Sequence, residues 1–287
     1  MKCKFKPNPK MGLKSEEIQA AAFIFSAELD PGEELLKIGD VTATRKDFES
    51  LCPTQQISEK ILYLTALKCV HNQTLLTWKN VWQLPPTFAD TILDGNNLDE
   101  ILVPMVKQFM QPTKDLQFIY IPMRENEHRY LMVISIHDSI IWQLDSYLED
   151  DDIQRRRTKM TTVAATVEHI LKSDIYNECK LEMKETCGDG EFMLQEESLI
   201  DIKCIITFTK YKMDCMLFRD SPSWVLQWMN LEHAFDAQCS EVHVLDENGT
   251  RMYTAMQLFH GRFNELKAEI APLVQEFWNM HAEDDDY

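Results

Sequence analysis

The stretch LQFIYIPMRENEHRYLMVISIHDSIIWQLD, residues 116–145, decides the fold that this sequence predicts. It holds three short segments, residues 116–122, 129–136 and 139–145, that are rich in β-branched and aromatic side chains. Such segments are typical of β-strands. His137 and Asp138 mark a tight turn between the last two segments, which favours an antiparallel hairpin. We therefore expect neighbouring strands in the middle of the chain.

The register of this hairpin makes a prediction about chemistry. If the turn is centred between its two residues, Asp145 faces Tyr130 on the neighbouring strand. His128 lies two residues before Tyr130, so His128 and Asp145 become diagonal neighbours on one face, roughly 7 to 8 Å apart at the backbone. A histidine oriented by a carboxylate is the base half of a catalytic triad. The pair is also compatible with a structural role, and a shift by one residue would place the two on opposite faces.

Helical periodicity surrounds the strand cluster. Apolar residues recur at helical spacing in several stretches: residues 57–70, 98–110, 158–171, 220–235 and 255–280. We expect Ser58 to cap the first helix, Pro104 to kink the second and Pro272 to interrupt the last. A further strand is predicted at residues 199–208. Helices, a strand cluster, then helix, strand and helices describe an α+β domain.

Composition and charge narrow the range of partners and settings. The 287 residues are 45% hydrophobic, enough for a packed core, and the formal net charge of -18 repels nucleic acid and anionic membranes. The eight cysteines form no CxxC pair, and the N-terminal MKCKFKPNPK has no apolar core. We therefore expect an intracellular monomer of the nucleus or cytoplasm, with no nucleic-acid or membrane partner. No nucleotide-binding or metal-ligand spacing is present in the sequence, so we expect no cofactor and no metal site.

The segment DSPSWVLQWMN, residues 220–230, supplies a place for a nucleophile. Asp220, Ser221 and Pro222 open a predicted amphipathic helix. The macrodipole and the free N–H groups at a helix N-terminus favour a thiolate or an oxyanion. The alternative is that Asp220 or Ser221 only caps the helix.

These segments, in this order, resemble the ubiquitin-like protease (SUMO-type, Ulp) family of cysteine peptidases, in its divergent plant and transposon-associated branch. In that family a His-Trp strand is followed by Leu-Asp-Ser and later by Gln-x-Asn-Gly-x-Asp-Cys-Gly leading into a helix. Residues 119–134, 142–147 and 220–230 match these motifs, and residues 51–61 are similar to the first helix of the family. The resemblance implies a papain-like fold with a central sheet flanked by helices.

The resemblance also implies an activity and a partition of the chain. The family's members are cysteine-type peptidases that act on the C-terminal tail of SUMO or a ubiquitin-like protein, or on its isopeptide conjugates. By this likeness His128 is the general base, Asp145 the orienting carboxylate and Ser221 stands at the position of the nucleophile. Residues 1–50 would be an N-terminal extension packed on the domain, residues 51–282 the catalytic domain and residues 283–287 an acidic tail.

The sequence departs from the family's pattern at the positions that carry its chemistry. Ser221 and Pro222 replace the usual cysteine and glycine, and Cys215 stands where the oxyanion glutamine belongs. Arg129 and Gln56 stand where tryptophans are usual. A serine has no preformed thiolate, and losing one oxyanion donor costs about 100- to 1,000-fold in rate. We therefore expect a weak or inactive protease, or alternatively a pseudoprotease that binds a ubiquitin-like protein or another partner.

Two further alternatives stay open. Cys215 also follows an aspartate, in MDCMLF, and could be the nucleophile itself. Residues 219–222 would break a helix that started at Cys215, which favours Ser221. An engineered serine that traps substrate is a second alternative, disfavoured because several family positions differ and not one alone.

Overall fold

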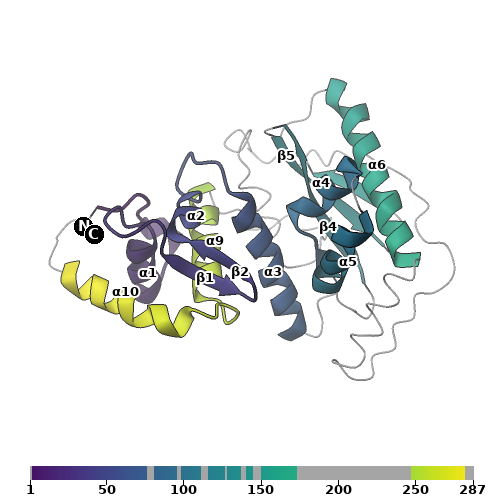
Figure 1. Cartoon of the computed structure of the whole chain (residues 1–287). Coiled ribbons are helices and arrows are strands. Elements are labelled where there is room, and N and C mark those ends of the chain that lie inside the picture. The colour runs from purple at the N-terminus through teal and green to yellow at the C-terminus, as the bar shows by residue number, and fades with distance from the viewer. Residues whose placement is uncertain are drawn as a thin grey trace. The chain divides into compact units, whose positions relative to one another are not determined.

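The computed structural model describes residues 2–75, 81–95, 98–110, 116–126, 128–136, 140–144, 150–172 and 247–281 (Figure 1). These residues fall into two compact units, one built from residues 2–68 and 247–281 and the other from residues 69–172. Each unit has its own set of helices and strands. None of the helices in the described part of the chain has the length and apolar character that crossing a bilayer requires.

The first unit joins the two ends of the chain. Its elements are η1 (Pro9–Met11), α1 (Ser15–Ile24), β1 (Glu34–Ile38), β2 (Val41–Thr44), α2 (Arg45–Glu49), most of α3 (Glu59–Leu75), α9 (Glu247–His260) and α10 (Lys267–His281). Strands β1 and β2 form an antiparallel hairpin. Its turn contains Gly39 at a φ of 57°, a left-handed conformation that glycine adopts without steric cost.

Asn264, between α9 and α10, ties the C-terminal helices to β1. Its Nδ2 donates to the carbonyl oxygens of Leu35 and Phe259, both at 3.0 Å, and its Oδ1 accepts from the Lys37 backbone N–H at 3.2 Å. The backbone N–H of Glu265 donates to the Lys37 carbonyl at 3.0 Å. Helix α1 packs on both α9 and α10. The N-terminal strands and the C-terminal helices therefore share one core.

Arg45 is a fully buried cation in this core. Its guanidinium donates to the carbonyl oxygens of Phe23 and Ile24 at the end of α1 and to that of Asp30. It also pairs with the carboxylate of Glu33. A buried charge is tolerated when such partners satisfy it, and the last carbonyls of a helix attract a cation. Arg45 thus caps the C-terminal end of α1.

The segment that precedes α3 is fixed by hydrogen bonds from α9 and by the N-terminal cap of α3 itself. Arg251 on α9 donates from Nη1 to the carbonyl oxygens of Ser50 and Cys52, each at 3.2 Å. The hydroxyl of Ser58 accepts from the Ile61 backbone N–H at 3.2 Å, which confirms the predicted cap of this helix. The helix predicted over residues 57–70 is α3, Glu59–Leu75.

The second unit contains a four-stranded mixed sheet. Its elements are β3 (Val81–Gln83), α4 (Pro86–Asp94), α5 (Leu98–Phe109), β4 (Phe118–Glu125), β5 (His128–Ser135), β6 (Ile140–Leu144) and α6 (Asp150–Lys172). The strand order is β3-β4-β5-β6, with β3 parallel to β4 and the other pairs antiparallel. Helix α4 begins three residues after β3, because Pro86 suits a first helical turn, and packs on β4, α5 and α6.

The β5–β6 register is the one predicted from the turn. Leu131 lies opposite Leu144, and Ser135 lies opposite Ile140. The three strands expected at residues 116–145 are confirmed as β4, β5 and β6, in neighbouring positions. In the hairpin of β4 and β5, Glu125 lies opposite His128. Asn126, which follows Glu125, has a φ of 55°, a conformation that asparagine tolerates better than most residues.

Two expectations about helices differ from the structure. The helix expected at residues 158–171 begins earlier, at Asp150, where Asp152 pairs with arginines three and four residues on. The last helical stretch is not interrupted at Pro272, which lies inside α10. Instead it breaks after Gly261, where a Cβ would lie 2.2 Å from the ring of Phe263. Pro104 lies within α5, and residues 199–208 and 220–235 lie outside the described residues.

Candidate functional site

The structure describes one of the three predicted triad residues. His128 is the first residue of β5 and is half-buried. Strand β6 runs beside β5 and ends at Leu144, the residue before Asp145. Asp145 and Ser221 lie outside the described residues, as does Cys215, so the triad and the choice of nucleophile stay predictions.

The imidazole of His128 lies against a buried aromatic ring. The ring of Tyr130 is 6.5 Å away between centroids and nearly parallel, at an interplanar angle of 13°. The two residues are two apart on β5 and so share one face of the sheet. On α6, the guanidinium carbon of Arg156 lies 5.3 Å from the centroid of the Tyr130 ring. Arg156, Tyr130 and His128 therefore form a continuous series of stacked groups.

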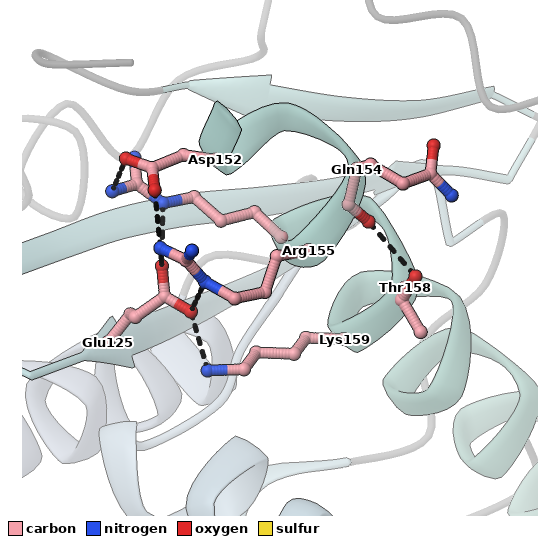
Figure 2. Close-up of polar contacts among 7 residues, drawn as sticks. Glu125, Asp152, Gln154, Arg155, Thr158 and Lys159 are labelled. Carbon is pink, nitrogen blue, oxygen red and sulfur yellow. Dashed lines mark hydrogen bonds and ion pairs between the residues drawn. The ribbon is translucent and has the colours of Figure 1, made fainter. Parts of the chain in front are cut away.

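Glu125, opposite His128 at the hairpin turn, is a carboxylate that is only 6% exposed. Figure 2 shows its contacts with α6. The oxygens of Glu125 accept from Nε and Nη2 of Arg155, both at 2.8 Å, and from Nε of Arg156 at 3.1 Å. Lys159 Nζ donates at 2.7 Å. All three cations come from α6, one turn apart or less. The network joins the end of β4 to the first half of α6.

Two carboxylates and three cations of this network are paired with one another. Hydrogen bonds from Arg155, then from Lys159 and Arg156, hold the pKa of Glu125 well below its ordinary value, although burial acts to raise it. The same contact raises the pKa of Arg155. Asp152 adds a second carboxylate, which pairs with Arg155 and accepts from Arg156 Nη2 at 2.9 Å. The cations are thus satisfied within the protein.

Sequence reasoning did not find this network, because a run of charged residues such as 149–157 is generally expected to lie in water. Arg156 is in fact 3% exposed. A signal was present, since Arg155, Arg156 and Lys159 fall within about one turn of a helix and Glu125 follows a buried strand. Nothing in the sequence linked the two, which are thirty residues apart. No group of His, Cys, Asp and Glu suited to a metal ion occurs among the residues that the structure describes.

The fold is that of ubiquitin-like protease domains, an α+β arrangement with a mixed sheet and flanking helices. The catalytic domain of the Ulp1-like SUMO protease from Chaetomium thermophilum superposes with a TM-score of 0.50 at 17% sequence identity. The match covers 88% of this chain and 91% of that domain. This likeness shows the fold alone.

Further solved structures of the same kind are similar. The C-terminal Ulp1 protease domain in complex with Smt3, the yeast orthologue of SUMO, has a TM-score of 0.49 and 17% identity over 88% of this chain and 97% of that one. The SUMO protease Ulp1 with its catalytic cysteine oxidised to a sulfenic acid has a TM-score of 0.46 and 16% sequence identity, and the match covers 91% of this chain and 99% of that one. No family model and no curated protein matches the sequence.

Proposed function

We propose that this chain is a ubiquitin-like protease-type domain that takes the C-terminal tail of a SUMO-type protein, or its isopeptide conjugates, and cuts weakly or not at all. The observation that supports this most is the β5–β6 register. It sets His128 at the start of β5, beside the strand that ends one residue before Asp145. The fold shared with the Chaetomium thermophilum SUMO protease domain adds to it.

In this proposal each residue has a role in attack on a carbonyl carbon. His128 takes the proton from the nucleophile and later returns it to the leaving amine, and Asp145 holds the imidazole in its productive tautomer. Ser221 is the nucleophile or what remains of it. Because a serine hydroxyl must lose its proton during the attack, it depends on the base more than a cysteine thiolate does.

The same resemblance supports a proposal for the family branch, the cellular compartment and the domain boundaries of the chain. We assign the chain to the plant and transposon-associated branch on residues 119–134 and 142–147, and to the nucleus or cytoplasm as a monomer. Residues 51–282 would form the catalytic domain and residues 1–50 an extension packed on it. The bonds of Asn264 to Leu35 and Lys37 support that packing.

Binding without cleavage is the second candidate, favoured by the replacements at the reactive positions. Ser221 takes the place of the family's nucleophilic cysteine, and Cys215 takes the place of its oxyanion glutamine. Arg129 and Gln56, in place of tryptophans, would also alter the channel for the tail. A domain with these changes could retain a groove for a ubiquitin-like protein while turnover is lost.

A cleavage series with C-terminal reporters of several ubiquitin-like proteins tests the proposal. The chain as it stands should show no measurable cleavage, and Ser221→Cys should give at most weak activity, since the absent donor still costs about 3 to 4 kcal/mol. Adding Cys215→Gln should help more than additively, because both groups act on one tetrahedral intermediate. His128→Ala should abolish what was gained.

Two outcomes of this series would contradict the proposal. Robust turnover by the unmodified chain, abolished by Ser221→Ala, would show an active serine peptidase. If the doubly substituted chain neither cuts nor binds any tail of the panel, the proposed function is wrong. Binding is measured by titration calorimetry with the same proteins, and its presence without cleavage would favour the pseudoprotease.

A further inference from the structure

Two routes connect α6 to His128 within the second unit. The first runs through the backbone, since Glu125 binds α6 and lies directly opposite His128 at the end of the hairpin. The second runs through side chains, from Arg156 over the ring of Tyr130 to the imidazole of His128. Both routes begin at the same ion pair, because Arg156 Nε donates to Glu125 at 3.1 Å.

Among the described residues, two carboxylates bind the Arg156 guanidinium and restrict its orientation. Nε donates to Glu125 and Nη2 donates to Asp152 at 2.9 Å, so the plane of the group has little freedom. Arg156 is 3% exposed and Tyr130 is fully buried, which excludes water from the contact. A desolvated guanidinium over an aromatic face is attracted more strongly than an exposed one. The ring of Tyr130 is therefore held from the side of α6.

The imidazole of His128 lies at the other end of this series of groups. His128 is the first residue of its strand and half-buried, and the buried Tyr130 ring provides a flat surface beside it. A general base works only when its ring nitrogen is directed correctly, and a displacement of about 1 Å can cost about 100-fold in rate. Groups that fix a catalytic side chain through packing hold it close to its productive geometry.

We propose that Arg156, oriented by Glu125, is a positioning residue that sets the orientation of the His128 imidazole through the ring of Tyr130. The inference rests on the proposed function, in which His128 is the base. Neither Arg156 nor Glu125 touches the substrate in this arrangement. Their effect is on the geometry of the base and not on its chemistry.

Arg155 offers a matched control on the same helix. It donates two hydrogen bonds to the same Glu125 carboxylate, each at 2.8 Å, and also pairs with Asp152. Its side chain, however, is 52% exposed, whereas that of Arg156 is 4% exposed. The cation–π contact with Tyr130 is made by Arg156. Loss of either arginine weakens the ion pair, but only loss of Arg156 is expected to release the ring.

The test is the NMR signal of the His128 ring in the full chain with ¹³C-labelled histidine, assigned from its loss in His128→Gln. Arg156→Met should shift or broaden this signal, and the shift should be several times larger than that in Arg155→Met. Tyr130→Phe, which keeps the ring, should leave the signal near its original position, and Tyr130→Leu should move it. An equal or larger shift in Arg155→Met, or an unmoved signal in Arg156→Met, would overturn the inference.

A second pair of variants is used if Arg156→Met does not fold. If the histidine signals of Arg156→Met collapse together, Arg156→Lys and Arg155→Lys are compared instead, since lysine keeps the charge but not the planar group. The larger displacement of the His128 signal must again belong to position 156, and the reverse order refutes the inference. The signal needs no turnover, so a failed cleavage series would count against the proposed function and leave this result standing.

Discussion

Glu125 is a carboxylate that the fold has removed from water and surrounded with cations from one helix. Its 6% exposure would be costly for an unpaired charge. Arg155, Arg156 and Lys159 satisfy its oxygens instead. Removing one partner from a buried ion pair leaves an uncompensated charge, so such a group is sensitive to substitution.

Glu125→Gln should destabilise the chain at neutral pH by about 3 to 5 kcal/mol, the range found when a buried pair is broken. The pKa of Glu125 is lowered in the folded state, so its contribution is present above the ordinary value of 4.5 and is lost as the pH falls below it. The variant should therefore lose less stability than the parent on acidification below pH 4.5. Urea unfolding at several pH values measures both effects.

Glu168→Gln is the control for this substitution. Glu168 pairs with Lys172 on the same helix, but the lysine is half exposed. An exposed pair of this kind contributes about 0.5 kcal/mol or less. Equal losses of stability in the two variants would mean that the Glu125 network is no stronger than a surface ion pair.

Cys52 should resist alkylation in the folded chain. Burial, followed by the nearby Glu49 carboxylate, raises the pKa of its thiol to about 11. At pH 8 the reactive thiolate is then rare, and the side chain is 7% exposed. Iodoacetamide labelling with mass spectrometry should find Cys3, which is half-buried, modified well before Cys52. Labelling of Cys52 as fast as in urea would contradict the assigned burial.

At the level of secondary-structure elements, the central strands were predictable and the N-terminal hairpin was not. The β-branched and aromatic segments and the turn predicted at His137 and Asp138 indicate the pairing of β5 with β6, and Leu131 opposite Leu144 confirms it. The hairpin of β1 and β2 was missed because its strands have only five and four residues. Their place depends on distant groups such as Asn264, which sequence periodicity does not reveal.

Of the candidate site, the sequence indicated the strands that carry it. His128 is the first residue of β5, and the β5–β6 register over residues 131–135 is the one that the predicted turn indicates. The ion pairs of Glu125 with α6 could not be predicted, because residues in contact across thirty positions leave no periodic pattern. Asp145 and Ser221 remain predictions from the sequence.

Gly261→Ala tests the packing that separates α9 from α10. An added Cβ would lie 2.2 Å from the ring of Phe263, which is 7% exposed and so has little room to move. Overpacking of this kind costs about 1 to 3 kcal/mol, which thermal unfolding would record as a lower Tm. Gly32→Ala is the matched control, since its Cβ would meet nothing closer than 3.4 Å. A variant at 261 as stable as the control would contradict the account of this break.

At the scale of the whole molecule, our proposal places an altered reactive position on the fold of ubiquitin-like protease domains. The fold is that of ubiquitin-like protease domains, while Ser221 and Cys215 stand at the positions of the nucleophile and the oxyanion donor by sequence resemblance. The chain carries a formal net charge of -18, so partners with a basic surface would be attracted at long range. In the proposed function, a tail that enters this domain meets position 221 beside His128.

Capture by an electrophilic tail is the sharpest test of this arrangement. A SUMO-type protein with a C-terminal vinyl sulfone forms a carbon–sulfur bond with a thiolate placed at the end of its channel, and peptide mass spectrometry locates the bond. The chain as it stands should form no adduct, Ser221→Cys should form one at position 221, and adding His128→Ala should slow its formation. An adduct at Cys215 of the unmodified chain, or none at position 221 in Ser221→Cys with every tail tried, would contradict the assigned site.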